Sequence, residues 1–199
     1  MSRNLSRSFV SGAFKWCFFL GNDLEKLSWV MREVADIETI AFGGGCHWCT
    51  EAVFQQLRGV REVEQGWVGS EGEASGLSEG VIVHFHTQEI SLKDLLLVHL
   101  HTHSSGAEHS MRGKYRSAVY VFDNAQKKAC ELLLKELKRD FPRKIVTRIL
   151  PYHRFEPSPE RIRNYYAKDP DKPFCRTYID PKFKKLLKLF PELLKEGPQ

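Results

Sequence analysis

The chain has 199 residues, 42% of them hydrophobic, and a formal net charge of +5. This composition excludes an intrinsically disordered chain, and the length suits one domain with short terminal appendages. Thirty Lys and Arg side chains stand against 25 Asp and Glu. The small excess of positive charge is concentrated near the C-terminus, so we expect no nucleic-acid partner.

Three regions are distinguished along the chain. We expect an N-terminal extension over residues 1–34, the main domain over residues 35–178, and a basic amphipathic helix over residues 179–199. The extension is rich in arginine and serine, as in organelle-targeting peptides. No apolar run approaches the roughly 20 residues of a membrane helix, so we expect no stable membrane insertion. We expect a cytoplasmic protein, with organelle targeting as the alternative.

Hydrophobic periodicity predicts alternating strands and helices. In chain order they are a strand at 38–42, a helix at 46–57, strands at 60–68 and 81–86, a helix from Ser91, a strand at 116–122, a helix from Asp123 and a strand at 145–150. Ser158-Pro159 and Asp180-Pro181 each predict a further helix start. The order β-α-β-β-α-β predicts an α+β, ferredoxin-like core, in which an antiparallel or mixed sheet carries its helices on one face.

The clearest chemical signal is Gly43-Gly44-Gly45-Cys46-His47-Trp48-Cys49, between a predicted strand and a predicted helix. A thiol at a helix N-terminus faces unpaired backbone N–H groups and the positive end of the helix dipole. Both lower the pKa of a thiol, so Cys46 is predicted to be a nucleophile. Cys49 follows within one turn, where a disulfide with Cys46 is feasible. The odd cysteine count of five favours intracellular thiol chemistry over a disulfide scaffold.

Three motifs occur in an order that resembles one enzyme family. They are G-C-H-W-C-T-E at 45–51, G-L-S-E at 76–79 and G-K-Y-R-S-A-V-Y at 113–120. Together they resemble the active-site segments of the peptide methionine sulfoxide reductase A family. The resemblance covers roughly residues 38–175 and implies reduction of methionine-S-sulfoxide, free or in peptides.

The resemblance also implies a role for each matched residue. Cys46 would attack the sulfoxide sulfur, and His47 and Trp48 would contact the substrate. Glu79 would protonate the departing oxygen, and Tyr115 would donate a second hydrogen bond to it. A sulfoxide oxygen leaves poorly until it is protonated, and a water-poor aromatic pocket favours the protonated form of an acid.

Turnover would oxidise Cys46 to a sulfenic acid, which a second thiol converts to a disulfide. The family pattern implies Cys175 as this resolving cysteine, and Cys49 competes because it is close in sequence. The resemblance further implies thioredoxin as the reductant, replaceable by dithiothreitol, with no cofactor and no metal. We expect a monomer, with Cys130 as a core thiol and Cys17 incidental.

The sequence departs from the family pattern in three places. His47 replaces a phenylalanine, and the loop 69–78 lacks a tyrosine that the family uses. The segment 103–111 lacks the family's G-N-D; the residues nearest to that aspartate's position are Glu108, His109 and Ser110. These departures affect substrate recognition more than the redox step.

Alternative readings remain open. A thiol–disulfide oxidoreductase would use Cys46 and Cys49 but leaves Glu79 and Tyr115 unexplained. A catalytically silent relative would bind the sulfoxide without turnover.

The histidines form two pairs with the spacing of zinc ligands. His99 and His103 share a helix face, and His84 and His86 share a strand face. We expect that neither pair binds metal. For the C-terminal helix we expect the apolar face to pack on the domain and the lysines to be solvated.

Overall fold

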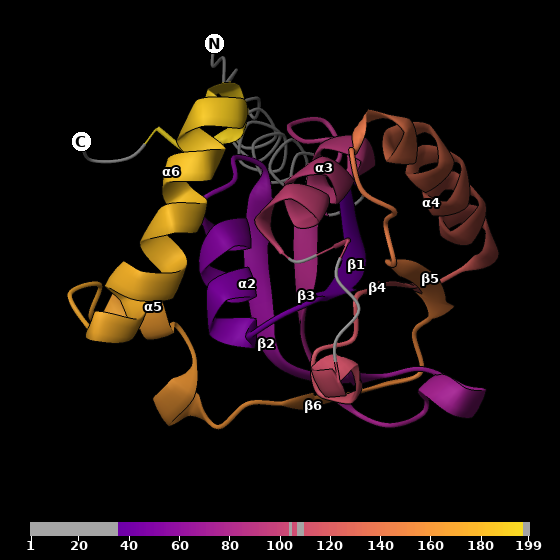
Figure 1. Ribbon diagram of the computed structural model, residues 1–199, viewed down its shortest axis with the longest axis horizontal. Coiled ribbons are helices and arrows are strands. Elements are labelled where there is room, and N and C mark those ends of the chain that lie inside the picture. The colour runs from indigo at the N-terminus through magenta and orange to yellow at the C-terminus, as the bar shows by residue number, and fades with distance from the viewer. Residues whose placement is uncertain (1–35, 104, 107–109, 197–199) are drawn as a thin grey trace, which may run out of the picture. The chain divides into compact units, whose positions relative to one another are not determined.

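The computed structural model describes residues 36–103, 105–106 and 110–196. The chain divides into two compact units, residues 1–37 and 38–199. The second unit contains the labelled helices and the sheet, whose first strand begins at its boundary (Figure 1). The expectations for residues 1–34, for Cys17 and for Glu108 and His109 lie outside the described residues.

The second unit is built from six strands and five α-helices among its described residues. The strands are β1 (Ile37–Gly43), β2 (Val60–Gly69), β3 (Ser78–His86), β4 (Ala118–Val121), β5 (Arg148–Pro151) and β6 (Arg154–Pro157). The helices are α2 (His47–Gln55), α3 (Leu92–Thr102), α4 (Asn124–Leu137), α5 (Tyr165–Lys168) and α6 (Asp180–Leu189). A π-helical segment, Cys175–Ile179, runs directly into α6.

The strands form one mixed sheet in the order β5-β4-β1-β3-β2-β6. β2 is antiparallel to β3 and β6, β1 is antiparallel to β4, and β4 is parallel to β5. The order β1-α2-β2-β3-α3-β4 is the predicted one, and the predicted α+β class is confirmed. Figure 1 shows α6 beside α2 and α4 near β5, at opposite ends of the sheet.

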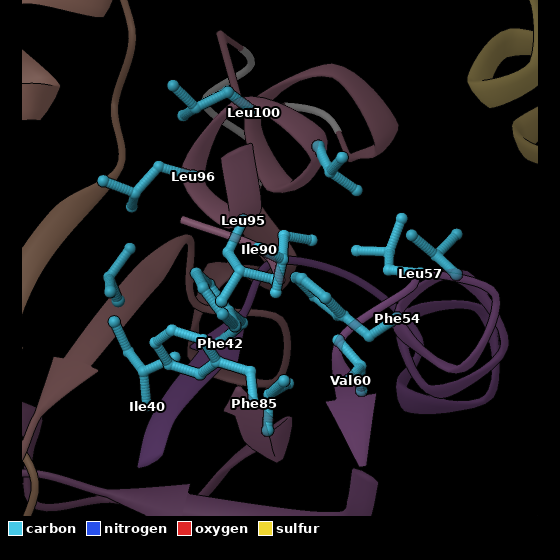
Figure 2. Close-up of a cluster of buried hydrophobic side chains, with 14 of the residues drawn as sticks. Ile40, Phe42, Phe54, Leu57, Val60, Phe85, Ile90, Leu95, Leu96 and Leu100 are labelled. Carbon is cyan, nitrogen blue, oxygen red and sulfur yellow. The ribbon is translucent and has the colours of Figure 1, made fainter. Parts of the chain in front are cut away.

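The main core lies between the sheet and the helices. Ile40 and Phe42 of β1 face it, and Ala41 between them faces the other side of the sheet, as a strand's alternation requires. Phe42 stacks on Phe54 of α2 with ring centroids 4.6 Å apart. Figure 2 shows these rings among leucines of α3, including Leu95. Burial of each such side chain contributes roughly 1.5–3 kcal/mol.

Side-chain caps begin α3 and α4 where the sequence predicted. Ser91 Oγ accepts a hydrogen bond from the Asp94 N–H, and the Asp94 carboxylate accepts one from the Ser91 N–H. Asp123 Oδ1 accepts the Gln126 N–H at 2.8 Å. Each cap satisfies an amide that the helix leaves free and contributes about 1 kcal/mol.

The region after residue 145 differs most from the predicted elements. The strand expected from residue 145 begins at Arg148, and Ser158-Pro159 is followed by a short 3-10 turn, Glu160–Ile162, instead of a helix. β6 is an unpredicted strand, which pairs with β2. α6 begins near the predicted Asp180-Pro181, but its N-cap is Ile179 because the π-helical segment precedes it.

The C-terminal helix packs on the domain. Leu186 is 1% exposed, and Phe183 and Phe190 contact the main core, whereas Leu187 is 60% exposed. Leu194, beyond α6, forms a β-bridge with Leu57. Among the described residues, no helix is both long and apolar enough to cross a membrane.

Candidate active site

A glycine turn joins β1 to α2 and brings the backbone close to its neighbours. A Cβ atom on Gly43 would lie 2.8 Å from the Arg116 carbonyl oxygen, and one on Gly44 would lie 2.4 Å from the His103 ring. Glycine is therefore required here for close approach. The turn ends at Cys46, which is the N-cap of α2.

The Cys46 thiol is partly buried and electrostatically distinct from its neighbour. A hydrogen bond from the Cys49 thiol, helped by the N–H groups of Trp48 and Cys49, lowers the pKa of Cys46 against the opposing effects of burial and Glu79. Donation to Cys46, together with burial, raises the pKa of Cys49. Of the two thiols, Cys46 is therefore the one that ionises more readily. The largest cause is the second cysteine, more than the helix terminus that the sequence suggested.

Glu79 presents a buried carboxyl group beside the first turn of α2. It lies on β3 opposite Trp67 of β2 and is 7% exposed. Its Oε2 accepts the His47 N–H at 3.1 Å, and its Oε1 lies 3.4 Å from Lys114 Nζ. The acid thus faces the residue that follows Cys46.

The side chains of His47 and Trp48 lie on different surfaces of α2. His47 Nδ1–H donates to the Gly66 carbonyl at 3.1 Å, which leaves Nε2 3.9 Å from Glu79 Oε2. Trp48 stacks on Tyr165 with ring centroids 4.2 Å apart. His47 therefore supports the carboxyl group, and Trp48 contacts the C-terminal segment.

A cavity of about 630 Å³ opens beside Cys46. Cys46, Cys49 and Tyr115 are the predicted site residues among those that line it; His47, Trp48, Glu79 and Cys175 are not among its lining residues. The other lining residues come mainly from α3 and α6 and the segment before α6: Gly44, Gly45, Thr50, Val53, His99, His101, Thr102, His103, Phe174, Thr177, Tyr178, Pro181, Lys182 and Lys185. None of these residues was predicted from the sequence to bind substrate.

Both candidate resolving cysteines lie in one apolar cluster with Cys46. Cys49, Cys175 and Ile179 are buried in it, and Cys46 packs against them. Burial raises the pKa of Cys175, whose Sγ donates to the Asp169 carbonyl oxygen at 3.5 Å. All three thiols are free.

Two histidines form an unpredicted part of the cavity wall. The rings of His99 and His103 stack 4.0 Å apart. His103 Nδ1–H donates to the His99 carbonyl, so its Nε2 accepts from Ser117 Oγ at 2.8 Å. Burial lowers the pKa of His103 to about 4 and that of His99 well below the ordinary value, so both rings are neutral. The helical spacing of the pair was the signal available in the sequence.

Within the described ranges, no group of three or more His, Cys, Asp or Glu side chains could hold a metal ion. His84 contacts Glu64 Oε1 at 2.8 Å and Thr39 Oγ1 at 2.9 Å.

Two lysines of α6 also line the cavity. Lys182 Nζ donates to the Thr102 carbonyl and Lys185 Nζ to the His101 carbonyl, at the last turn of α3. The expectation that the lysines of this helix are solvated is wrong for Lys182, which is half-buried. Its position depends on the packing of α6 against α3, for which the local sequence holds no signal.

Comparison with known proteins decides the family. A model of the family described as peptide methionine sulfoxide reductase matches residues 38–192. The chain belongs to the peptide methionine sulfoxide reductase family.

Relatives of this reductase span most of its length. Peptide methionine sulfoxide reductase MsrA of Acinetobacter baumannii (strain SDF) is 35% identical over 170 residues, covering 78% of this chain and 97% of the relative. An MsrA of Thermus thermophilus is 34% identical over 174 residues, covering 80% and 98%.

Solved structures share the fold. The reduced form of Mxr1 from Saccharomyces cerevisiae has a TM-score of 0.61 at 21% identity, covering 72% of this chain and 92% of that one. Methionine sulfoxide reductase A of Corynebacterium diphtheriae has a TM-score of 0.60 at 20% identity, covering 68% and 76%.

In this reductase a buried acid anchors the C-terminal segment to α2. Glu51 is 1% exposed; its Oε1 accepts the Asn164 N–H at 2.9 Å, and its Oε2 accepts Gln65 Nε2 at 2.7 Å. Burial raises the pKa of Glu51, and these donors oppose the rise. The anchor precedes Tyr165, so it holds that ring against Trp48.

Proposed function

We propose that this chain reduces methionine sulfoxide, free or in peptides, to methionine by thiol chemistry at Cys46. The observation that carries the proposal is the lowered pKa of the Cys46 thiol at the N-cap of α2, beside the buried Glu79 carboxyl group. Family membership supports the same activity. The sequence resemblance adds a preference for the S epimer.

In the first step the Cys46 thiolate attacks the sulfoxide sulfur while Glu79 delivers a proton to the oxygen. The Tyr115 hydroxyl donates a hydrogen bond to that oxygen as negative charge builds on it. The sulfoxide is reduced to the thioether by two electrons, and Cys46 is oxidised to the sulfenic acid. The oxygen and a proton end on the Cys46 sulfur as its hydroxyl group.

We assign supporting roles to the two aromatic residues that follow Cys46. Trp48, fixed by its stack on Tyr165, contributes an apolar surface for the substrate methyl group. His47 holds Glu79 through its backbone N–H, and its imidazole lies 3.9 Å from the same carboxylate oxygen.

For the second step we infer that Cys49 resolves the sulfenic acid. The Cys49 thiol is the main cause that lowers the pKa of Cys46, and it lies in the first turn of the helix that Cys46 begins. Its Sγ also contacts the Tyr178 carbonyl at 3.9 Å, and the Cys175 thiol donates to the Asp169 carbonyl. Attack of Cys49 on the Cys46 sulfenic acid forms the disulfide and releases water. One equivalent of sulfoxide peptide without reductant should therefore give a Cys46–Cys49 disulfide, detected by mass spectrometry. A Cys46–Cys175 disulfide that forms in Cys49→Ser, with no disulfide at Cys46 in Cys175→Ser, would assign the role to Cys175.

We propose thioredoxin as the physiological reductant, since an external dithiol reopens the disulfide by exchange. A solved structure shows Saccharomyces cerevisiae Mxr1 in complex with Trx2, at a TM-score of 0.51 to this chain. The chemistry uses no prosthetic group. The free thiols suit the reducing cytoplasm, where we place a monomeric enzyme.

The deciding experiment is turnover of a Met-S-sulfoxide peptide with dithiothreitol. Conversion of the peptide's methionine sulfoxide to methionine supports the reductase. Binding of the peptide without any conversion identifies a silent relative, and reduction of insulin disulfides without sulfoxide reduction identifies a thiol–disulfide oxidoreductase. Either of the last two results overturns the proposal.

A further inference from the structure

The charged side chains that line the cavity beside Cys46 are positive. Its described lining residues include Lys182 and Lys185, and none of those residues is acidic. His99 and His103 are neutral because burial lowers their pKa values. The positive charge facing the cavity is therefore that of two ammonium groups on α6, and the Cys46 thiol is the lining group that carries negative charge when it ionises.

Lys182 is the more unusual of the two lysines. It is half-buried, and its hydrogen-bond partner among the described residues is a backbone carbonyl, that of Thr102. Desolvation of this ammonium group lowers its pKa, and the nearby Cys49 and Cys46 thiols oppose the shift. Buried ammonium groups are ordinarily paired with acids, so Lys182 has the character of a ligand-binding charge.

The last turn of α3 balances only part of this charge. Lys185 Nζ donates to the His101 carbonyl at 2.6 Å, next to the Thr102 carbonyl that Lys182 uses. The C-terminal end of a helix carries about half a negative charge. Two ammonium groups exceed this half charge even when the Cys46 thiol is ionised, so the cavity is positive overall.

A further polar atom in the wall is unpaired. His99 lines the cavity and is 1% exposed, and its Nε2 has no hydrogen-bond partner within the described part of the chain. A buried nitrogen of this kind can donate to an oxygen of a bound ligand. It lies on α3, across from the two lysines of α6.

We propose that this cavity binds a carboxylate carried by the sulfoxide substrate, with Lys182 and Lys185 as its partners. The inference rests on the proposed reductase function. Cys46 and Tyr115 line the same cavity, so a substrate whose sulfur lies at Cys46 extends its neighbouring groups toward α6. The carboxylate is either the α-carboxylate of methionine sulfoxide or an acidic side chain next to the oxidised methionine. A cationic neighbour is disfavoured by the same charges.

Matched substrates separate these two sources. The first set consists of end-blocked peptides in which Met-S-sulfoxide is followed by Glu, Gln or Lys, and it tests an acidic neighbouring side chain. The second set compares N-acetyl-methionine sulfoxide with its methyl ester, and it tests the α-carboxylate. Dithiothreitol is the reductant in both sets. A charge-assisted contact should favour Glu over Gln by about tenfold in kcat/KM, mainly through KM. A preference for the acid over the ester identifies the α-carboxylate as the bound group. Added salt should reduce either preference.

Variants test the residues. Lys182→Met and Lys185→Met should each lower the preference for the anionic substrate, and Lys182→Arg should keep it. Lys184→Met is the matched control, since Lys184 is exposed on the same helix and is not among the cavity-lining residues. The ratio of kcat/KM for the Glu peptide to kcat/KM for the Gln peptide is measured within each variant. A smaller amount of folded enzyme lowers both values equally and therefore does not change the ratio.

The outcomes separate this inference from the proposed function. Equal kcat/KM for Glu and Gln peptides and for acid and ester would overturn the carboxylate site while the reductase stands. A preference that survives in the Lys182→Met/Lys185→Met double variant would overturn the assignment of these lysines. If no substrate is turned over, the proposed function fails. Calorimetry then compares the affinity for N-acetyl-methionine sulfoxide with that for its methyl ester, and tighter binding of the acid supports the carboxylate site while equal affinities overturn it.

Discussion

Two cysteines of this chain differ in their position in a helix and in their burial. Cys46 is the partly buried N-cap of α2, where hydrogen bonds lower the pKa of its thiol. Cys130 lies inside α4 at 0% exposure, where burial raises the pKa of its thiol to about 12. Cys46 therefore ionises more readily than an ordinary cysteine, and Cys130 remains a thiol at neutral pH.

The difference shows that the groups around a cysteine set the pKa of its thiol, and at Cys46 the neighbouring Cys49 thiol contributes most. At the N-cap, the backbone N–H groups of Trp48 and Cys49 lie close to the Cys46 sulfur and help to lower the pKa of its thiol, although the Cys49 N–H also donates to the Cys46 carbonyl at 3.1 Å. In the interior of α4 the amides bind carbonyls four residues back, and the surroundings of Cys130 are apolar. The same atom is a nucleophile in one setting and a packing group in the other.

The largest expected effect separates the two thiols directly. Cys46→Ser should lower turnover of a Met-S-sulfoxide peptide by a factor on the order of 10⁴ or more, because the hydroxyl is a far weaker nucleophile. Cys130→Ala should leave turnover unchanged and lower the free energy of unfolding by about 1–2 kcal/mol, measured in urea. A comparable loss of turnover in both variants would contradict the assignment of Cys46 as the nucleophile and Cys130 as a packing group.

A second test concerns the acid beside Cys46. Glu79→Gln keeps an acceptor for the His47 N–H but removes the transferable proton. The rate of sulfoxide reduction in a single turnover should therefore fall by about 10²–10⁴-fold. Glu156→Gln is the matched control, because Glu156 is exposed and pairs with Trp67 from the opposite strand. An unchanged rate in Glu79→Gln would exclude proton donation by this side chain.

The glycine turn before Cys46 is tested by two adjacent substitutions. A Cβ on Gly44 would lie 2.4 Å from the His103 ring, whereas one on Gly45 would have no atom within 4 Å. Gly44→Ala should therefore lower the free energy of unfolding by about 1–3 kcal/mol, and Gly45→Ala much less. Urea denaturation of both variants measures the difference, and equal destabilisation would speak against the close approach.

The smallest effect is a shift in pH dependence. Cys49→Ala removes the hydrogen bond that most lowers the pKa of Cys46, so that pKa should rise. Because the thiolate then forms only at higher pH, the pH profile of Cys46 alkylation by iodoacetamide should move toward alkaline pH. Cys130→Ala should leave the profile in place. A shift to lower pH in Cys49→Ala would contradict the assigned hydrogen bond.

Local signals predicted the starts of α2, α3 and α4 and the position of Cys46, whereas the helix predicted at Ser158-Pro159 is a short 3-10 turn. The glycine run marked the turn before α2, and Ser91 and Asp123 marked the caps of α3 and α4. β6 was not predicted, because Phe155 is the one strongly apolar residue of Arg154–Pro157 and the strand exists through pairing with β2.

Long-range contacts account for the rest of what the sequence did not reveal. Cys175 joins Cys49 in one cluster only because the C-terminal segment folds back over α2. Lys182 reaches the cavity only because α6 packs on α3. Neither contact has a local sequence pattern, because each depends on residues from distant parts of the chain.

The attachment of the C-terminal end to α2 has a consequence for biosynthesis. Lys195 Nζ donates to the Gln55 carbonyl, 140 positions earlier, next to the Leu57–Leu194 bridge. At about 5–20 residues per second, a ribosome needs roughly 7–28 s to cover that span. During this time the contacts that residues 194 and 195 make with the end of α2 cannot form. This part of the fold is therefore completed only after residue 195 has been synthesised.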